Sequence, residues 1–463
     1  MKKLLVALLA AGAAFGQSSP QDLEMMKHYR ALIQINTSSP PGNETLAVDY
    51  LRKVLEAEGI PTKTFALDPK RANLVARIKG NGSKKPLLLM AHTDVVPVQR
   101  EKWPVDPFGA IQKDGYVWGR GSRDDKDKLA ANLMVMLRAK REKVPLDRDL
   151  IFLAESGEEA DTAGVGIAYM VANHFDEIEA EFAITEGGGA TIDGASNKVS
   201  VVTVGTSEKV PRRARLVATG VSGHGSVPRL DNPLIHLGGA LQKVGTWETP
   251  MRLNDTTRTY FEKLTGMSSP AQAARYRQLL QGGAGAAEAQ KYMAANEGSR
   301  YSMLRTSVVP TIIKAGVGAN VIPSEAEATL DIRALPDEDM AKFFADMAKV
   351  IGDPAVKIEP ITANLRPAAP PSRLDTEMYK AIEKISGAMF PGTVVLPTMS
   401  TGASDMAQLR AKGIPSYGIG PASSDRDSAQ YGAHGDVERL LETSVYQFAD
   451  FTWRVVMEVA RGK

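Results

Sequence analysis

Five side chains of metal-binding type follow apolar segments or lie in turn-rich stretches of this chain. They are two imidazoles and three carboxylates, a donor set that suits two divalent cations with one carboxylate bridging them. The 463-residue chain contains no cysteine, so a metal site must be built from His, Asp and Glu. The candidate ligands are His92, Asp124, Glu159, Glu186 and His434.

Two further acidic residues beside these candidates can serve the same chemistry without binding metal. Asp94 lies two residues beyond His92, and the alternation of an extended chain puts both side chains on one side. We expect Asp94 to accept the other ring N–H of His92, which fixes the tautomer and raises ligand basicity. Glu158 and Glu159 are adjacent, so their side chains diverge and one can bind metal while the other stays free as a base.

Short apolar strands alternate with helical segments in the first part of the chain and must position these side chains. Residues 87–91 have the composition of a buried parallel strand that ends before His92, and residues 129–137 predict a helix that begins near Asp124. In open α/β sheets, strand ends and helix starts face one crevice, so His92 and Asp124 can meet over a shared ion. Further strands are predicted at 73–78, 149–154, 181–184 and 199–204, with helices at 22–35, 44–59 and 164–171.

The sequence pattern changes near residue 208. Residues 213–216 and 327–333 alternate polar with apolar types like half-exposed strands, and 232–244 and 337–350 have the spacing of amphipathic helices. A segment at about 250–300, rich in Ala, Gln, Gly and Tyr, interrupts this pattern as a helical insertion. Together these elements predict an inserted α+β lid domain.

The last hundred residues return to the alternation of strands and helices seen in the first part of the chain. A Pro-rich linker at 366–371 precedes a helix at 376–386, a strand at 416–419 and a long final helix from about Val437. We therefore predict an α/β fold, a doubly wound mixed sheet built from two chain segments, which also suits a chain too long for one core. The predicted divisions are a signal peptide at 1–16, catalytic segments at 17–207 and 364–463, and the lid at 208–363.

The first sixteen residues have the pattern of a secretory signal peptide, with Lys2 and Lys3 ahead of an apolar core too short to span a membrane. The chain has 56 basic and 54 acidic residues, so losing those two lysines leaves a mature net charge of zero. That balance gives no sign of nucleic acid or a membrane surface as a partner. We predict a periplasmic or secreted protein.

The motifs around the candidate residues resemble those of the M20 family of metallopeptidases in order and approximate spacing. The family includes glutamate carboxypeptidases, succinyl-diaminopimelate desuccinylases, aminoacylases and carnosinase-like dipeptidases. The length, signal peptide and long insertion are most similar to its carboxypeptidase S-like and N-acyl-amino-acid hydrolase branch. The resemblance covers essentially all of the mature chain and rests on AHTDVVP at 91–97, GRGSRDDK at 119–126, Glu158-Glu159, the EGG run from Glu186, and the late His434.

The resemblance implies a role for each position. Glu158 resembles the general base and Asp94 the residue that orients a histidine. Two Zn²⁺ ions are the implied cofactors, with Co²⁺ or Mn²⁺ as alternatives. Asp127 departs from the pattern, because many members have Gly after Asp-Lys. The ligands divide into two sets that share Asp124 as the bridging residue, with Glu159 and His434 on one metal and His92 and Glu186 on the other.

In the lid, the resemblance implies substrate contacts. His224, within SGHGS, matches a histidine that helps to stabilise the oxyanion in relatives, and Asn320, within GANVIP, matches a residue that holds the substrate. Arg333, within DIR, does the same, and a guanidinium fork suits a free C-terminal carboxylate. Residues 402–405 of the second catalytic segment are expected to line the pocket. A homodimer through the lid is compatible with the resemblance.

We therefore predict a secreted co-catalytic zinc hydrolase that cleaves an amide or peptide bond next to a free carboxylate. Its substrate is a peptide or an N-acyl amino acid, so carboxypeptidase, dipeptidase and N-acyl-amino-acid hydrolase activities all fit. One rival is a non-catalytic metal-dependent binding protein of the same fold, but Glu158, which no metal requires, argues against it. The other is a dinuclear metal esterase or phosphate hydrolase, and Arg333 favours the amide instead.

Overall fold

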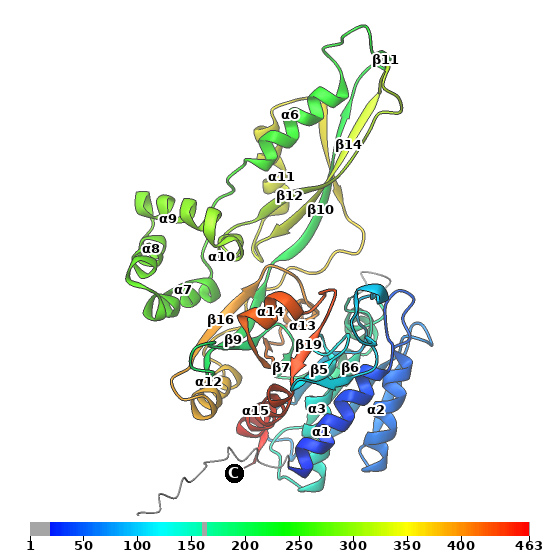
Figure 1. Cartoon of the computed structure of the whole chain (residues 1–463), viewed down its shortest axis with the longest axis vertical. Coiled ribbons are helices and arrows are strands. Elements are labelled where there is room, and N and C mark those ends of the chain that lie inside the picture. Colours follow the sequence, from blue (N-terminus) through cyan, green and yellow to red (C-terminus); the bar gives the residue numbers. More distant parts are fainter. Residues whose placement is uncertain (1–18, 160–163, 463) are drawn as a thin grey trace, which may run out of the picture.

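The computed structural model describes residues 19–159 and 164–462, and the predicted signal peptide at 1–16 lies outside them. Figure 1 shows a catalytic domain from which a long lid extends. The catalytic domain contains the first and last helices, α1 (Pro20–Gln34) and α15 (Glu442–Ala460). The chain enters the lid after β9 (Val199–Glu208) and leaves it after β15 (Val356–Ile361), so the lid is an insertion.

A mixed sheet of ten strands, counted over the described residues, forms the centre of the catalytic domain. β3 (Leu87–His92) lies between β6 (Leu150–Glu155) and β7 (Phe182–Thr185), and it runs parallel to both. β17 (Ser416–Gly418) pairs with β7, which joins the two chain segments in one sheet. β9 also belongs to the sheet, and the other members are β1 (Thr62–Phe65), β2 (Asn73–Ile78), β8 (Gly189–Ile192), β16 (Val394–Ser400) and β18 (Ala422–Ser424).

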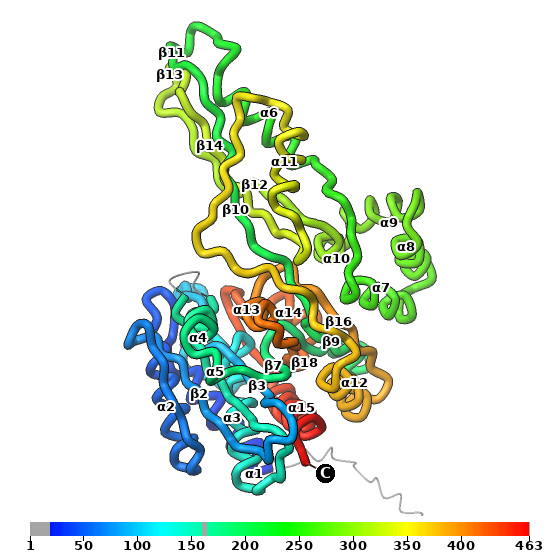
Figure 2. Tube along the Cα trace, turned by 180° about the vertical axis from the view of Figure 1, so that it is seen from behind, coloured from blue at the N-terminus to red at the C-terminus, as the bar shows by residue number. Residues whose placement is uncertain are grey.

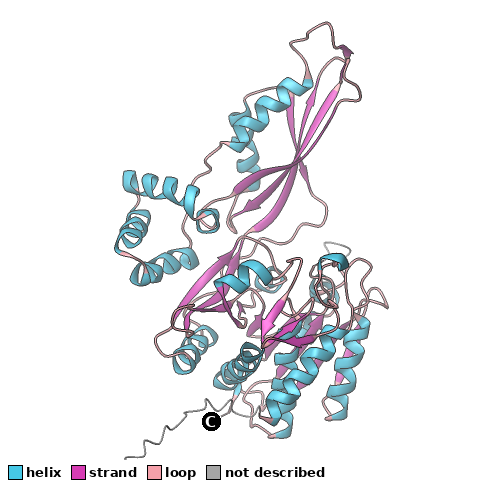
Figure 3. Ribbon diagram, viewed as in Figure 1, coloured by secondary structure: helices cyan, strands magenta, loops and turns pink. Residues whose placement is uncertain are grey.

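Helices cover both faces of this sheet (Figure 3). Leu87 and Leu89 belong to the core on one face, whereas Leu88 and Met90 belong to the core on the other. Burial on both faces explains why β3 is an unbroken apolar run. The first core includes α1, α2 (Thr45–Ala57), α3 (Lys126–Arg141), α12 (Glu377–Met389) and α15, and the second includes α4 (Ile167–Asn173), α5 (Phe175–Ile178) and α13 (Met406–Ala411).

The lid is a four-stranded antiparallel sheet with β15 at one edge. β14 (Glu325–Ala334) pairs with β10 (Val210–Thr219) and β12 (Ser307–Ala315), and its alternate residues are buried, as the sequence pattern predicts. Side chains of α6 (Pro233–Gly245) and α11 (Met340–Ile351) share the core on its buried face. A short pair, β11 (Gly223–His224) and β13 (Val321–Ile322), forms the tip of the lid (Figures 1 and 2).

The predicted insertion is helical and joins the two domains by apolar contacts. Phe261 and Leu264 of its first helix share a core cluster with Leu396 and Met399 of β16. The same cluster includes Leu335, directly after β14 of the lid. The insertion therefore packs against both the catalytic domain and the base of the lid (Figure 2). Its helices are α7 (Asp255–Met267), α8 (Pro270–Gln281), α9 (Gly283–Asn296) and α10 (Gly298–Ser302).

The final helix begins at Glu442 rather than near Val437, because residues 439–441 form a strand before it. This strand, β19 (Arg439–Leu441), pairs with β5 (Tyr116–Trp118), which in turn pairs with β4 (Ile111–Lys113). The linker at 366–371 has no regular structure, as expected. In the described part of the chain, we find no helix with the length and apolar character needed to cross a membrane. The remaining short helices are η1 (Arg100–Lys102) and α14 (Asp425–Tyr431).

Candidate metal centre and active site

The five predicted ligands gather at the carboxyl edge of the parallel strands. His92 is the last residue of β3, Glu186 directly follows β7, and Glu159 lies in the turn after β6. Asp124 lies just before α3, and His434 lies just after α14. Because the carboxyl ends of parallel strands face one crevice, residues from both chain segments meet there.

Asp124 stands between the two imidazoles. His92 Nε2 lies 3.0 Å from Asp124 Oδ1, and His434 Nε2 lies 3.1 Å from Asp124 Oδ2. Glu159 Oε1 is 2.8 Å from His434 Nε2, and Glu186 Oε2 is 3.9 Å from His92 Nε2. The ligand atoms form two groups, each within 4.8 Å, which are His92, Asp124, Asp125 and Glu186, and Asp124, Glu159 and His434.

These two groups fit a pair of divalent cations that share Asp124. Burial, helped by the charges of Glu158 and Asp124, raises the pKa of Glu186 well above its ordinary value. Hydrogen bonds to Asp124 and Glu159 raise the pKa of His434 to about 10. The Glu186 shift reflects burial beside other carboxylates, and the His434 shift reflects its two carboxylate partners, so bound cations would relieve the excess of negative charge. Imidazole nitrogens and carboxylate oxygens are ligands that divalent transition metals accept, so the donor set fits a dinuclear site.

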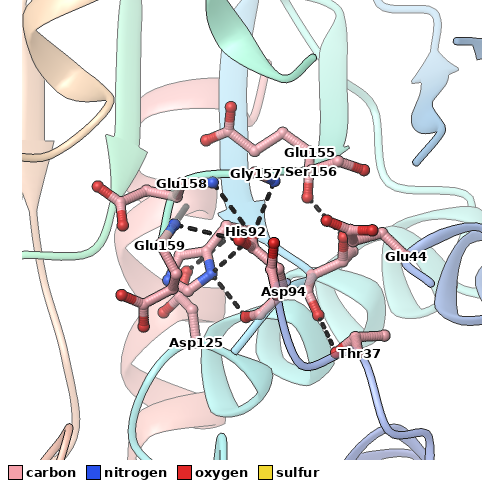
Figure 4. Close-up of polar contacts among 12 residues, drawn as sticks. Thr37, Glu44, His92, Asp94, Asp125, Glu155, Ser156, Gly157, Glu158 and Glu159 are labelled. Atoms are coloured by element: carbon pink, nitrogen blue, oxygen red, sulfur yellow. Dashed lines mark hydrogen bonds and ion pairs between the residues drawn. The ribbon is translucent and has the colours of Figure 1, made fainter. Parts of the chain in front are cut away.

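Asp94 organises the loop that carries the two adjacent glutamates (Figure 4). Its buried carboxylate accepts the main-chain N–H groups of Gly157, Glu158 and Glu159 at 2.9, 3.1 and 3.1 Å. The expected contact between its carboxylate and the His92 ring is present, and His92 Nδ1 also has a nearer partner. That nitrogen lies 3.0 Å from the Asp94 main-chain carbonyl and 3.5 Å from its Oδ1. The main chain and the side chain of Asp94 therefore both contact the imidazole, and the side chain also holds the loop.

Glu158 lies outside both ligand groups and contacts a guanidinium instead. Arg366 Nη2 donates to Glu158 Oε1 and to its main-chain carbonyl, both at 3.2 Å. Arg366 Nη1 donates to Asp405 Oδ1 at 3.1 Å. Burial and the charge of Asp405 raise the pKa of Glu158 to about 8, against the opposing charges of His92 and Arg366. A carboxyl group that titrates near neutral pH beside a metal ligand suits proton transfer.

A buried glutamate, which the sequence analysis missed, ties the turn before α3 to the turn after α14. Glu438 accepts the main-chain N–H groups of Gly121 and Arg123 at 3.2 and 2.6 Å. It also accepts from Arg120 Nη1 at 2.8 Å, and Arg120 Nη2 donates to the Gly435 carbonyl at 2.9 Å. The turns that carry Asp124 and His434 are therefore positioned together. The one signal in the sequence was an acidic residue four positions beyond that histidine.

Arg366 and Asp125 are two further residues of the site without a predicted role. Arg366 begins the predicted linker. The sequence feature that could have indicated its role is a single positive charge at the start of an apolar, Pro-rich run. Asp125 Oδ2 accepts the main-chain N–H of His92 at 3.2 Å, and its Oδ1 lies 2.7 Å from Lys128 Nζ. Asp127 is fully buried, and its carboxylate also contacts Lys128 Nζ, at 3.2 Å. Lys128 therefore balances the extra carboxylate, which stays outside both ligand groups.

A match to a family model agrees with this geometry. The model described as peptidase family M20/M25/M40 matches residues 88–458, which include all five predicted ligands. The chain belongs to this M20 family. M20 peptidases and aminoacylases are hydrolases that act on amide or peptide bonds, and the family is metal-dependent. The predicted family and enzyme class are therefore confirmed.

Relatives and solved structures agree with the M20 assignment. Probable carboxypeptidase S-like 2 of Dictyostelium discoideum is 28% identical over 391 residues, which cover 83% of this chain and 74% of that protein. Human N-fatty-acyl-amino acid synthase/hydrolase PM20D1 is 27% identical over 412 residues, covering 84% and 78%. The M20 metallo-carboxypeptidase Sso-CP2 of Sulfolobus solfataricus matches with a TM-score of 0.65 at 18% identity, covering 94% of this chain and 99% of that one. The predicted fold class is confirmed.

Within one copy of this M20 chain, His224 and Asn320 do not join the metal ligands. Both lie in the tip of the lid, on the side away from the catalytic domain (Figures 1 and 2). There, the Gly225 N–H donates to the Asn320 carbonyl at 2.7 Å, and Ser226 Oγ lies 2.7 Å from His224 Nδ1. The expectation that they act at the site is not met inside one chain, because the long strands of the lid carry its tip away.

Arg333 of the M20 chain does lie at the site. It lines a cavity of about 390 Å³ together with Glu158, Glu159 and His434. Its Nε donates to Asp331 Oδ2 at 3.0 Å, which fixes one edge of the guanidinium. A carboxylate held by Arg333 would therefore lie in the same cavity as the metal ligands.

The predicted pocket segment 402–405 divides into two parts. Its first two residues line the same cavity. Ser404 Oγ donates to Glu208 Oε2 at 2.6 Å, and Asp405 accepts from Arg366. Asp405 thus supports Arg366 of the M20 cavity, and Ser404 contacts Glu208, rather than either residue lining the cavity.

Proposed function

We propose that the protein is a zinc-dependent M20 hydrolase that releases an amino acid with a free carboxylate from a peptide or an N-acyl amino acid. The observation that supports this most directly is the wall of one cavity, which contains Glu158, Arg333 and the ligands Glu159 and His434. One small substrate can therefore reach three things at once. They are Glu158, which can move a proton, Arg333, whose charge suits a carboxylate, and the metal centre. The names of the relatives, carboxypeptidase S-like 2 and N-fatty-acyl-amino acid synthase/hydrolase, agree with this class.

In the proposed reaction, two divalent cations held by the five ligands would supply Lewis acidity and acidify a water molecule. Glu158 removes a proton from the attacking water and returns it to the nitrogen of the leaving amine. Arg366 keeps the Glu158 side chain in place, and Asp94 fixes the loop from which that side chain projects. Arg333 binds the substrate carboxylate, so the scissile bond is held against the metal centre.

A substrate screen tests the proposal. The purified protein, loaded with zinc, is assayed against a panel of dipeptides and N-acyl amino acids, each paired with its C-terminal amide. We expect turnover of free acids and its loss after chelation, with recovery when zinc is restored. If no member of the panel is hydrolysed by protein that demonstrably holds two metals, the proposed function is wrong. Hydrolysis of ester analogues alone would favour the esterase alternative.

Arg333→Ala should remove the preference for a free carboxylate. The lost contact is a charge-assisted bidentate pair, typically worth about 1.5–3 kcal/mol, or roughly a tenfold to hundredfold loss in kcat/KM. The loss should fall on the free acid and largely spare the amide, because the amide never made the contact. The measurement is kcat/KM for one matched acid and amide pair in both proteins.

The double comparison separates a direct contact from general damage to the lid, which would depress both substrates alike. Arg215→Ala is a suitable control, since Arg215 lies on the lid strand β10 and pairs with Glu327 and Glu359 away from the cavity. A wild-type preference for the free acid in Arg333→Ala would show that another group binds the carboxylate.

We also propose that the physiological metal is zinc and that the protein is exported to the periplasm or secreted. Two imidazoles among carboxylates support zinc, and the charged start and apolar core of residues 1–16 support export. Metal analysis of protein isolated without added metal tests the first proposal, and manganese or cobalt as the main metal would replace it. Cell fractionation tests the second, and uncleaved protein in the cytoplasm would count against it.

We further propose that two copies pair through the lid. The tip carries large apolar side chains at its surface, with Leu230 99% and Val317 90% exposed. Apolar residues exposed to this degree favour an interface, and a second copy would also give His224 and Asn320 a catalytic domain to face. Sedimentation of the full protein tests the pairing, and a monomer at micromolar concentration would exclude it.

A further inference from the structure

Arginines outnumber acidic residues in the wall of the catalytic cavity. Among the described residues that line it, the carboxylates are Glu158 and Glu159. Positive charge is therefore concentrated beside the glutamate that moves the proton. The arginines of the wall are Arg212, Arg213, Arg333 and Arg366.

Arg366 and Arg333 contact carboxylates of the described chain. Arg366 lies 3.2 Å from Glu158 Oε1 and 3.1 Å from Asp405 Oδ1, and Arg333 lies 3.0 Å from Asp331 Oδ2. The charges of Asp405 and Glu158 raise the pKa of Arg366 even though burial opposes the rise. Two carboxyl groups therefore lie against Arg366 and one lies against Arg333.

Arg212 differs, because its hydrogen-bond acceptors are main-chain carbonyls. Its Nη1 donates to the carbonyl oxygens of Pro211 and Arg366, at 2.8 and 3.0 Å. Within residues 19–159 and 164–462, no carboxylate forms an ion pair with it. It is half-buried, and burial lowers the pKa of its guanidinium. A half-buried cation that pairs with no described carboxylate is costly, and an anion entering the cavity would offset that cost.

We infer that Arg212 binds a second carboxylate of the substrate, so that the enzyme prefers dicarboxylic peptides or N-acyl amino acids over their neutral analogues. The inference rests on the proposed function, in which Arg333 binds the first carboxylate and Glu158 acts at the bond between. A planar guanidinium matches a carboxylate with two parallel N–H donors, which a neutral amide cannot accept equally. The cavity of about 390 Å³ has room for an acidic amino acid.

A second carboxylate can come from either side of the scissile bond, so two isosteric pairs are needed. N-acetylglutamate against N-acetylglutamine tests the side chain of the leaving amino acid. N-succinylalanine against N-succinamoylalanine tests the acyl group. Within each pair only a carboxylate and a carboxamide differ. In the zinc-loaded wild type, we expect kcat/KM for the acid to exceed that for the amide by at least about tenfold in one pair.

Arg212→Gln should bring the two members of that pair to within about twofold of each other, since the charged contact is lost. Arg212→Lys should keep part of the preference, because it keeps the charge without the fork. Arg215→Gln makes the same substitution on the same strand outside the cavity and should keep the wild-type ratio. Equal values for acid and amide in both wild-type pairs would overturn the inference. The inference would also be overturned if Arg212→Gln, with unchanged thermal stability, kept the wild-type ratio of kcat/KM for the acid to that for the amide.

Failure of the proposed function would look different. If the substrate screen yields turnover but neither pair is hydrolysed, the pairs are measured as competitive inhibitors, and the same ratios are expected in Ki. If the screen yields no turnover at all, the proposed function fails. Calorimetric binding of each pair to the zinc-loaded protein then still decides whether Arg212 discriminates acid from amide.

Discussion

Asp124→Ala should leave the protein unable to hold either metal at the occupancy of the wild type. Asp124 contributes one oxygen toward His92 and the other toward His434, so a single substitution removes a ligand from both groups. The loss should lower turnover by at least about a thousandfold, because several kcal/mol of stabilisation by the metals disappear with them. The measurement is metal content by mass spectrometry after dialysis, together with kcat on the best substrate.

Glu186→Ala is the matched comparison. Glu186 belongs only to the group that contains His92, so its loss should empty mainly that site and leave the Glu159 and His434 side occupied. Circular dichroism of both variants shows whether the fold is retained. If the two substitutions lowered metal content equally, the bridging assignment of Asp124 would have to be abandoned.

Glu158→Gln should keep two metals bound and lower kcat by at least about a hundredfold, since only proton transfer is removed. The change is isosteric, and the amide oxygen can still accept the bond that Arg366 Nη2 now donates to Oε1. The position of the side chain is therefore preserved while its ability to take a proton is lost. Metal content and single-turnover kinetics measure the two effects separately.

Glu179→Gln is the control for that substitution, because it makes the same change at an exposed glutamate after α5. It should leave both metal content and kcat within about twofold of the wild type, as is usual for surface substitutions. Loss of metal together with activity in Glu158→Gln would make Glu158 a ligand, and the division of labour between the adjacent glutamates would then be wrong.

Local sequence pattern was enough to predict the centre of the catalytic domain. β3 is recognisable because Leu88 and Leu89 face different cores, which leaves a continuous apolar run, and the polar residues directly after it must then lie at the sheet edge. The alternation of β14 predicted the lid sheet for the complementary reason, because one of its faces is buried and the other is mostly half-buried. Both signals depend only on neighbours within a few residues.

The parts that sequence reasoning missed depend on contacts between distant segments. Arg366 meets Glu158 across 208 positions, and Arg120 meets Glu438 across 318, so no periodicity reports either pair. The place of His224 is set by the length and direction of the lid strands rather than by its own motif. The nearer partner of the His92 ring was not predicted, because alternation describes side chains and cannot reveal a turn that presents a main-chain carbonyl.

The two ligand groups differ in when the growing chain can complete them. His92, Asp124, Asp125 and Glu186 all lie within the first catalytic segment, on elements that surround β3, so one group is encoded before any of the lid has been synthesised. The other needs His434, which follows after the whole lid, the linker and most of the second segment. Synthesis thus supplies the two halves of the centre in a fixed order. A chain that ends before residue 434 can contain the group with His92 and Glu186 but cannot contain the group with His434. The second group is therefore present only in chains that also contain the whole lid.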